Sequence, residues 1–164
     1  MTAPTYAVRV GTPSDASILR DLRCEALLES PSAYGARYSD IATQPLAYWE
    51  KLLRQRHYFL ACSTNEAVGM ACVDRFEFDH YVGLGVFSMY VRAASRGSRV
   101  AADLIDACKA YARSRGANSL YLDVVDGNDR ALAFYLREGF VPVGELRPMA
   151  KDESRTMRAM VSAL

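Results

Sequence analysis

The fold is decided by the stretch Met89-Tyr90-Val91-Arg92-Ala93-Ala94-Ser95-Arg96-Gly97-Ser98-Arg99-Val100-Ala101. It begins as the end of an apolar strand, passes through a loop of small and basic residues, and enters a helix that apolar spacing predicts up to Arg115. The first amides of such a helix lack intrahelical partners, and the helix dipole and the two arginines add positive potential. The stretch predicts either an anion site suited to a diphosphate or an ordinary connection with solvated arginines.

Strand and helix patterns alternate on both sides of this stretch, which favours two packed layers around one core. Upstream, three consecutive apolar runs predict an antiparallel meander, and downstream a strand–helix–strand crossover implies a parallel pair. Thr12-Pro13-Ser14-Asp15 predicts the start of a first helix. The expected strands are 6–10, 57–63, 67–76, 84–91, 119–125, 140–144 and 155–161, and the expected helices are 12–29, 45–56, 100–115 and 129–138.

Composition and charge exclude several classes of protein. The 164 residues predict one domain, residues 1–164, and 51% hydrophobic content excludes a disordered chain. A net charge of +1 argues against binding nucleic acid through phosphate neutralisation and against a polybasic membrane anchor. The sequence has no apolar run near the ~18 residues of a membrane span, and its first residues lack signal-peptide features. We therefore expect a cytoplasmic protein that binds neither nucleic acid nor membrane.

The four cysteines, Cys24, Cys62, Cys72 and Cys108, are scattered along the chain. The sequence has no C-x-x-C motif and no histidine at ligand spacing, so no metal site is expected. We expect small buried apolar residues in a reducing compartment. The alternative is a redox-active or nucleophilic cysteine, but no histidine or basic cluster lies nearby to support it.

A second informative segment follows the decisive stretch. The strand Leu120-Tyr121-Leu122-Asp123-Val124 precedes Asn128, Tyr135 and Gly139-Phe140. Taken in order, the loop R-G-x-x-V-A at 96–101, the L-x-L-x-V strand and N-x6-Y-x3-G-F resemble the acetyl-CoA-dependent GNAT N-acetyltransferases. The resemblance runs through nearly the whole chain, from the strand at Val8 to the strand at Arg158.

This resemblance implies both a fold and a reaction. The fold is α+β with α/β/α layers, in which a mixed central sheet of six to seven strands packs against about four helices. The reaction is transfer of an acetyl group from acetyl-CoA to a primary amine of a small molecule. Because no activated Cys or Ser stands out in the sequence, we expect direct attack in a ternary complex.

The resemblance also assigns acetyl-CoA binding to particular residues. Main-chain amides of the loop would wrap the pyrophosphate, and those of Met89, Tyr90 and Val91 would bind the pantetheine and the thioester carbonyl. Asn128 would lie near the pantetheine and is also a candidate helix N-cap. The family pattern has glycine where this chain has Arg99, which fits only if Arg99 has helical dihedrals. The loop residues concerned are Arg96, Gly97, Ser98, Arg99, Val100 and Ala101.

Tyr135 and Asp123 are the catalytic candidates. Tyr135 matches the family tyrosine that faces the CoA sulfur, where a phenol can protonate the leaving thiolate. The alternative is a core aromatic on an apolar helix. Asp123 lies twelve residues earlier, at the strand position where the branch of the family that acetylates protein N-termini has its general base. The alternative is an ordinary solvated strand residue.

Three residues in one turn are rival bases, and four aromatic residues are candidates for acceptor contacts. The rivals are Glu77, Asp79 and His80. The sequence leaves open the acceptor amine, an acyl donor other than acetyl-CoA, and assembly as a homodimer. A protein or peptide acetyltransferase and a non-catalytic acyl-CoA-binding module are the alternative functions. The aromatic candidates are Tyr34, Tyr38, Trp49 and Tyr90.

Overall fold

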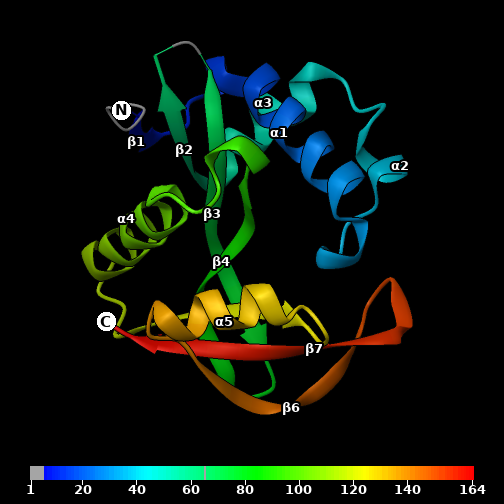
Figure 1. Cartoon of the computed structure of the whole chain (residues 1–164), viewed down its shortest axis with the longest axis vertical. Coiled ribbons are helices and arrows are strands. Elements are labelled where there is room, and N and C mark those ends of the chain that lie inside the picture. The colour runs from blue at the N-terminus through cyan, green and yellow to red at the C-terminus, as the bar shows by residue number, and fades with distance from the viewer. Residues whose placement is uncertain (1–5, 65) are drawn as a thin grey trace.

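A computed structural model describes residues 6–64 and 66–164. Residues 1–5 and Asn65, which the sequence places in the first hairpin turn, lie outside the described residues. The described chain contains a seven-stranded mixed sheet of order β1-β2-β3-β4-β5-β7-β6 (Figure 1). The strands are β1 (Tyr6–Val10), β2 (His57–Ser63), β3 (Ala67–Phe78), β4 (Tyr81–Val91), β5 (Ser119–Val125), β6 (Val141–Met149) and β7 (Asp152–Ala163).

Helices cover both faces of the sheet, so the expected α/β/α layering is confirmed. On one face α1, α2 and α3 pack over a cluster that includes Leu22, Trp49 and Met70. On the other face α4 and α5 pack over a cluster that includes Leu104, Leu122 and Tyr135. The helices are α1 (Ala16–Glu29), α2 (Tyr38–Ile41), α3 (Leu46–Gln55), α4 (Val100–Ser114) and α5 (Asp129–Arg137).

The expected meander and parallel pair are both present. β2, β3 and β4 pair antiparallel in succession, and β4 pairs parallel with β5 through the crossover helix α4. The strand after α5 does not pair with β5, because β7 inserts between β5 and β6 and is antiparallel to both. The last strand of the chain therefore lies inside the sheet.

The β3–β4 hairpin is longer than its sequence suggested. Polar residues and glycines predicted a broad turn over 77–83, but pairing continues to Phe78 and Tyr81, whose rings stack. Cross-strand aromatic pairs stabilise a hairpin beyond the range that propensity alone supports. The turn is reduced to Asp79 and His80.

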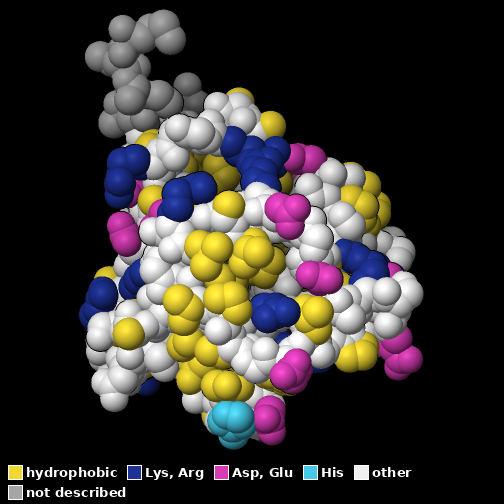
Figure 2. All heavy atoms as spheres, turned by 60° about the horizontal axis from the view of Figure 1, so that its bottom comes forward, with side chains coloured by type: hydrophobic (Ala, Val, Ile, Leu, Met, Phe, Trp, Pro, Cys, Tyr) yellow, Lys and Arg dark blue, Asp and Glu magenta, His cyan; other side chains and the backbone are white. Residues whose placement is uncertain are grey.

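The strand β6 lies at the edge of the sheet and carries exposed apolar side chains. Val141 is 54% exposed and Leu146 is 40% exposed. Figure 2, which brings the lower end of Figure 1 forward, shows hydrophobic side chains gathered in a band on that face. Pro142 and Pro148 lie in the same strand. Proline lacks the N–H that a further strand would need, so these residues protect the edge from additional pairing.

The start of α1 is held by a buried carboxylate. Asp15 is 6% exposed, and it accepts two hydrogen bonds from the Arg9 guanidinium on β1, at 2.7 and 2.8 Å. It also accepts a hydrogen bond from the Thr12 main-chain N–H. These bonds favour the ionised form and lower the pKa of Asp15 to about 2. Asp15 thus links the first strand to the first helix.

Replacing Asp15 with Asn should lower the free energy of unfolding by about 2 kcal/mol at neutral pH. The pKa of Asp15 is lowered in the folded protein, so its contribution is present above its ordinary pKa of 3.8 and is lost as pH falls towards about 2. The difference between Asp15→Asn and wild type should therefore narrow over that range in urea unfolding.

The matched control is Asp21→Asn. Asp21 pairs with Arg20 at 3.0 Å on the exposed side of α1, and such pairs contribute only about 0–1 kcal/mol. An equal loss of stability in both variants would contradict the special role of Asp15.

Candidate active site

A cavity opens in the sheet where β4 and β5 separate. The two strands pair only from Leu84 with Leu120 to Val86 with Leu122, although β4 continues to Val91 and β5 to Val125. The two strands therefore diverge beyond this short paired segment. The cavity has a volume of about 720 Å³ and is also bounded by the loop before α4, by α5 and by the segment after α1.

All but one of the expected cofactor-binding and catalytic residues line this cavity. The exception is Val100, which is 2% exposed and packs in the core beneath α4. The sequence did not single out Phe87, Ser88, Arg130 or Met157, which also line it. The expected residues that line the cavity are Met89, Tyr90, Val91, Arg96, Gly97, Ser98, Arg99, Ala101, Asp123, Asn128 and Tyr135.

A β-bulge at Ser88 accounts for the separation of the strands. Ser88 has φ +54°, and the β3–β4 register shifts at this point. The extra residue resets the alternation of side chains, so Val86 and Met89 both face the α4–α5 layer while Phe87 and Tyr90 face the α1–α3 layer. Beyond the bulge the β4 edge no longer pairs with β5. No sequence signal marked this bulge, because a serine inside a strand is not distinctive.

The loop before α4 has the backbone that an anion site requires. Gly97 has φ +76°, a conformation that glycine adopts without strain. Arg99 has φ −79° and ψ −3°, so the helical dihedrals needed at the non-glycine position are present. The Ser98 hydroxyl donates to the Ser95 carbonyl at 2.6 Å and holds the loop closed on itself.

Both arginines of this loop have acidic partners, so their charge is less available than the sequence suggested. Arg96 forms an ion pair with Glu29 and donates through Nε to the Val91 carbonyl at 2.9 Å. Arg99 lies 3.1 Å from Asp103 and 3.7 Å from Asp106. Main-chain N–H groups at the start of α4 add to the positive potential of the site, and Arg130 and Arg137 also line the cavity.

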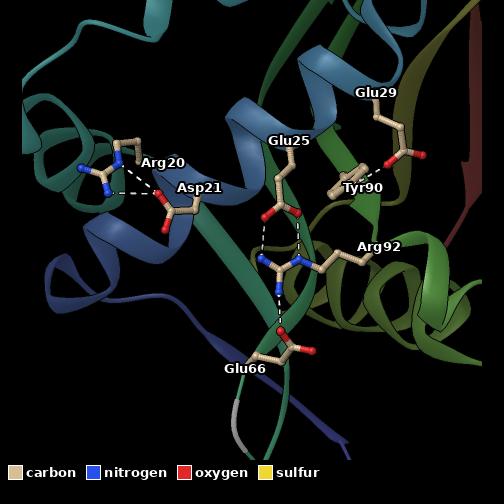
Figure 3. A network of polar contacts seen from close by, with 7 residues as sticks. All are labelled: Arg20, Asp21, Glu25, Glu29, Glu66, Tyr90 and Arg92. Carbon is tan, nitrogen blue, oxygen red and sulfur yellow. Dashed lines mark hydrogen bonds and ion pairs between the residues drawn. The ribbon is translucent and has the colours of Figure 1, made fainter.

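Polar contacts join α1 to the end of β4 (Figure 3). Arg92 donates to both carboxylate oxygens of Glu25, at 2.6 and 2.8 Å, and to Glu66 at 2.8 Å. Two residues away, the Tyr90 hydroxyl donates to Glu29 at 2.7 Å, and this bond helps to lower the pKa of Glu29. The contacts fix the end of β4, which there pairs with β3 but not with β5, against the helix layer. Sequence reasoning missed them because the partners are far apart along the chain.

The position of Tyr135 is compatible with both roles that the sequence allowed, a core aromatic residue and a proton donor at the cavity. Its ring is 9% exposed and packs edge-on against Phe140, with centroids 5.8 Å apart, as a core aromatic does. It also lines the cavity. Burial raises the pKa of the phenol above its ordinary value, so the hydroxyl is protonated at neutral pH and can act as a proton donor.

Asp123 lines the cavity from the opposite face of the sheet. Its neighbours Leu122 and Val124 pack with Tyr135 in the α4–α5 layer, and adjacent strand residues face opposite ways. The cavity therefore passes between β4 and β5 and reaches Tyr135 on one side and Asp123 on the other. Burial raises the pKa of Asp123, and an ion pair with Arg147 at 2.6 Å opposes that rise.

The rival base residues lie outside the cavity. Glu77 pairs with Arg75 at 2.9 Å, and His80 Nδ1 lies 2.9 Å from Asp79 in the exposed β3–β4 turn. None of the three lines the cavity. Among the acidic and imidazole candidates that the sequence suggested, only Asp123 faces it.

A smaller side pocket of about 240 Å³ adjoins the cavity and shares Tyr34, Gly35 and Met149 with it. The Tyr34 hydroxyl donates to the Met89 carbonyl at 2.8 Å, so the segment after α1 is tied to β4. Tyr38 lines the side pocket. Trp49 is 1% exposed and belongs to the core, so it is not an acceptor contact.

Beside the side pocket, the turn between β6 and β7 contacts α2 and the residue before it. Lys151, in the turn between β6 and β7, lies 2.6 Å from the Asp40 carboxylate on α2. Arg37, just before α2, donates to the Lys151 carbonyl at 2.5 Å. These contacts, here called the Lys151 bridge, join segments more than a hundred residues apart.

The cysteines show no sign of a catalytic role. Cys72 and Cys108 are buried as expected, whereas Cys24 and Cys62 are only partly buried, so the expectation is wrong for those two. Burial raises the pKa of the Cys72 thiol to about 12. Over residues 6–64 and 66–164, no group of three or more His, Cys, Asp and Glu residues is placed to hold a metal ion. No helix in the same ranges is long and apolar enough to cross a membrane.

Comparisons with known proteins agree with this geometry. The sequence profile of the Acetyltransferase (GNAT) family matches residues 19–140. Acetyltransferase Atu2258 of Agrobacterium fabrum is 35% identical over 68 residues, which are 42% of this chain. That match spans 48% of the Agrobacterium protein, so the chain spans about half the length of this curated relative.

Solved structures share the fold. A GNAT acetyltransferase from Streptococcus pneumoniae superposes with a TM-score of 0.80 and 17% identity, covering 98% of this chain and 100% of that one. The Salmonella typhimurium protein yncA, solved with its cofactor acetyl-CoA, superposes with a TM-score of 0.77 and 18% identity, covering 98% and 94%. At these identities the likeness concerns the fold.

Replacing Asn128 with Ala should lower the free energy of unfolding by about 1 kcal/mol, because the Asn128 side chain accepts a hydrogen bond from the Ala131 N–H and caps α5. Asn128→Ser should restore most of the stability, since serine caps equally well. Asn118→Ala, at an exposed position before β5, is the control and should change little. Urea unfolding measures all three, and a serine variant no better than alanine would argue against the cap.

Proposed function

Because the chain belongs to the acetyltransferase (GNAT) family, we propose that it is an acyltransferase that moves the acetyl group of acetyl-CoA to a primary amine of a small molecule. The observation that carries this proposal is the cavity between β4 and β5. It presents unpaired main-chain groups, a protonated phenol and a carboxylate to one space.

The residues present fit acetyl-CoA. The open backbone at Gly97 and the amides at the start of α4 suit a diphosphate, and the unpaired β4 edge from Met89 to Val91 suits an amide-bearing chain such as pantetheine. A Cβ at Gly97 would meet no atom within 4 Å, so the loop leaves space for a ligand. When bound, acetyl-CoA supplies an activated thioester.

Each side chain then has one task. Asp123 takes a proton from the attacking ammonium, directly or through water, so that the nitrogen lone pair can form the new C–N bond. Main-chain N–H groups on β4 stabilise the charge that develops on the carbonyl oxygen. Tyr135 donates its proton to the sulfur as the C–S bond breaks. After the C–N bond has formed, the nitrogen loses its second proton to water. The protonated carboxyl of Asp123 then returns its proton through water to the Tyr135 phenolate, so that one proton is released for each acetyl group transferred.

The Lys151 bridge supports a small acceptor. A peptide acceptor needs an open groove between the segment after α1 and the β6–β7 hairpin, and in this chain those segments touch through Arg37, Asp40 and Lys151. The pair between Lys151 and Asp40 is exposed and so adds little to stability. The pair narrows the entrance for the acceptor because of where it lies, although it holds the two segments together only weakly.

We also propose a cytoplasmic location. It is supported by the four cysteines, all of which are free thiols, as expected in a reducing compartment.

The proposal is tested by measuring CoA thiol release from acetyl-CoA against a panel of small primary amines and a panel of peptides with free N-termini or lysines. We expect turnover with one or more small amines and little with peptides. Turnover with peptides alone would make the protein a peptide acetyltransferase. Tight binding of acetyl-CoA without turnover on any amine would make it an acyl-CoA-binding module.

Replacing Tyr135 with Phe should lower kcat by about a hundredfold, because the leaving thiolate loses its acid. The dissociation constant for acetyl-CoA, measured by calorimetry, should stay within a factor of about two because the ring and its packing remain. Tyr111→Phe is the matched control, since Tyr111 on α4 stacks against His57 away from the cavity. A fully active Tyr135→Phe enzyme would remove the acid role.

Replacing Gly97 with Ala should raise the dissociation constant for acetyl-CoA about tenfold, because φ +76° strains any side-chain-bearing residue and the loop leaves its binding conformation. Gly116→Ala is a close control. Gly116 has φ +78°, a Cβ there also meets no atom within 4 Å, and the residue lies outside the cavity lining. Equal weakening of binding by both variants would show a general stability effect instead of a loop effect.

A further inference from the structure

We propose that Arg147 is a positioning residue that holds the Asp123 carboxylate in one orientation and leaves its second oxygen facing the cavity for the acceptor ammonium. The inference rests on the proposed function, and it assigns a role to a residue on β6 that carries no family motif.

Arg147 forms its ion pair with Asp123 from outside the cavity. Arg147 donates through one terminal nitrogen to Asp123 Oδ1 at 2.6 Å, and the side chains of Arg147 and Asp123 are 19% and 25% exposed. Asp123 lines the cavity and Arg147 does not. No hydrogen bond to Oδ2 is found among the residues that the structure describes. One carboxylate oxygen is therefore occupied by the protein, and the other is available to a substrate.

The guanidinium itself is fixed by an aromatic face. Its central carbon lies 3.9 Å from the centroid of the Phe78 ring, a cation–π contact. Its other terminal nitrogen, Nη1, is buried and has no hydrogen-bond partner within the described ranges. An unpaired buried donor is unfavourable, so Phe78 and Asp123 must hold the side chain there.

The backbone of β6 is bent to reach this place. The register between β6 and β7 shifts between Val143 and Arg147, and Gly144 within that interval has φ +68°. A Cβ at Gly144 would lie 3.0 Å from the Phe78 ring, so the strand passes close to the same aromatic residue. The irregular strand brings Arg147 over Phe78 and against Asp123.

No other charged group competes for Asp123 within the described structure. The β7 residue opposite Asp123 is Ala159, and Arg158 beside it pairs with Val124, whose side chain faces the other layer. The β4 segment past its last pair with β5, residues 87–91, carries no charge. On α5, Tyr135 lies across the sheet. Arg147 is the charged group that acts on this carboxylate.

The pair has a clear chemical consequence. Burial disfavours the ionised carboxylate, and Arg147 opposes that effect. An ionised Asp123 binds an ammonium and then takes its proton, whereas a protonated Asp123 does neither. Without Arg147 the buried carboxylate loses its partner, and its pKa rises further.

The test compares Arg147→Met and Arg147→Lys with wild type. Arg147→Met removes the charge but keeps the length, so the acidic limb of the kcat profile should move up by about one pH unit and kcat/KM for the amine should fall roughly tenfold. Arg147→Lys should restore most of the limb's position. Acetyl-CoA affinity should change less than about twofold in both.

The control is Arg75→Met, an exposed arginine on β3 that pairs with Glu77, which should leave the profile unchanged. In a double-mutant cycle, Asp123→Asn combined with Arg147→Met should be no slower than Asp123→Asn alone, because Arg147 acts through Asp123. The inference would be overturned if Arg147→Met lowered the rate by the same factor at every pH, or if the losses of rate from the two substitutions were additive in the cycle.

A second measurement does not depend on turnover. Carbon-detected NMR titration of the Asp123 carboxyl should give a pKa about one unit or more higher in Arg147→Met than in wild type. Thermal melting checks that the variants are folded. If Arg147→Met is not folded, the titration is carried out on Arg147→Lys instead. An unchanged pKa overturns the inference while leaving the acetyltransferase proposal intact, whereas a shifted pKa without amine turnover in wild type overturns the proposed function.

Discussion

Strands β4 and β5 pair along only three residue pairs. Beyond Val86 and Leu122 their facing edges do not pair with each other, and this gap is the constraint to which the other elements respond. Unpaired main-chain groups inside a sheet are costly unless a partner satisfies them. The bulge at Ser88 creates the opening, and α1 fixes the free end of β4 through Tyr90 and Arg92. The protein thus keeps a gap open that a bound chain with its own amides can close.

The same opening brings chemistry from two layers to one space. Tyr135 belongs to the α4–α5 core, and Asp123 faces the other side of the sheet. In a continuous sheet these groups would be separated by a layer of backbone. Because the strands part, the Tyr135 phenol and the Asp123 carboxyl, whose pKa values are both raised by burial, reach the same cavity. At Asp123 the ion pair with Arg147 opposes this rise, whereas every influence on the pKa of Tyr135 raises it.

The charged residues near the cavity act through local ion pairs rather than through a net charge of the whole molecule. The net charge is +1, and the two loop arginines that suggested a basic anion site are each paired with acidic residues. The proposed anion site therefore relies in part on oriented main-chain N–H groups, which carry no net charge and do not appear in a count of residues. Glu29, paired with Arg96 and Tyr90, links this loop to α1.

The sequence by itself determined the elements whose signals are local: the apolar period of α4, the strand runs, the loop 96–101 and the cap at Asn128, because each depends on residues within a few positions of one another. Those signals sufficed for the family, the mixed sheet and all but one of the residues assigned to the cavity. Only the tertiary structure decided the bulge at Ser88, the insertion of β7 beside β5, and the contact of Arg147 with Asp123. These features join residues whose proximity depends on strand order and register, which packing of the whole chain sets and no local pattern encodes.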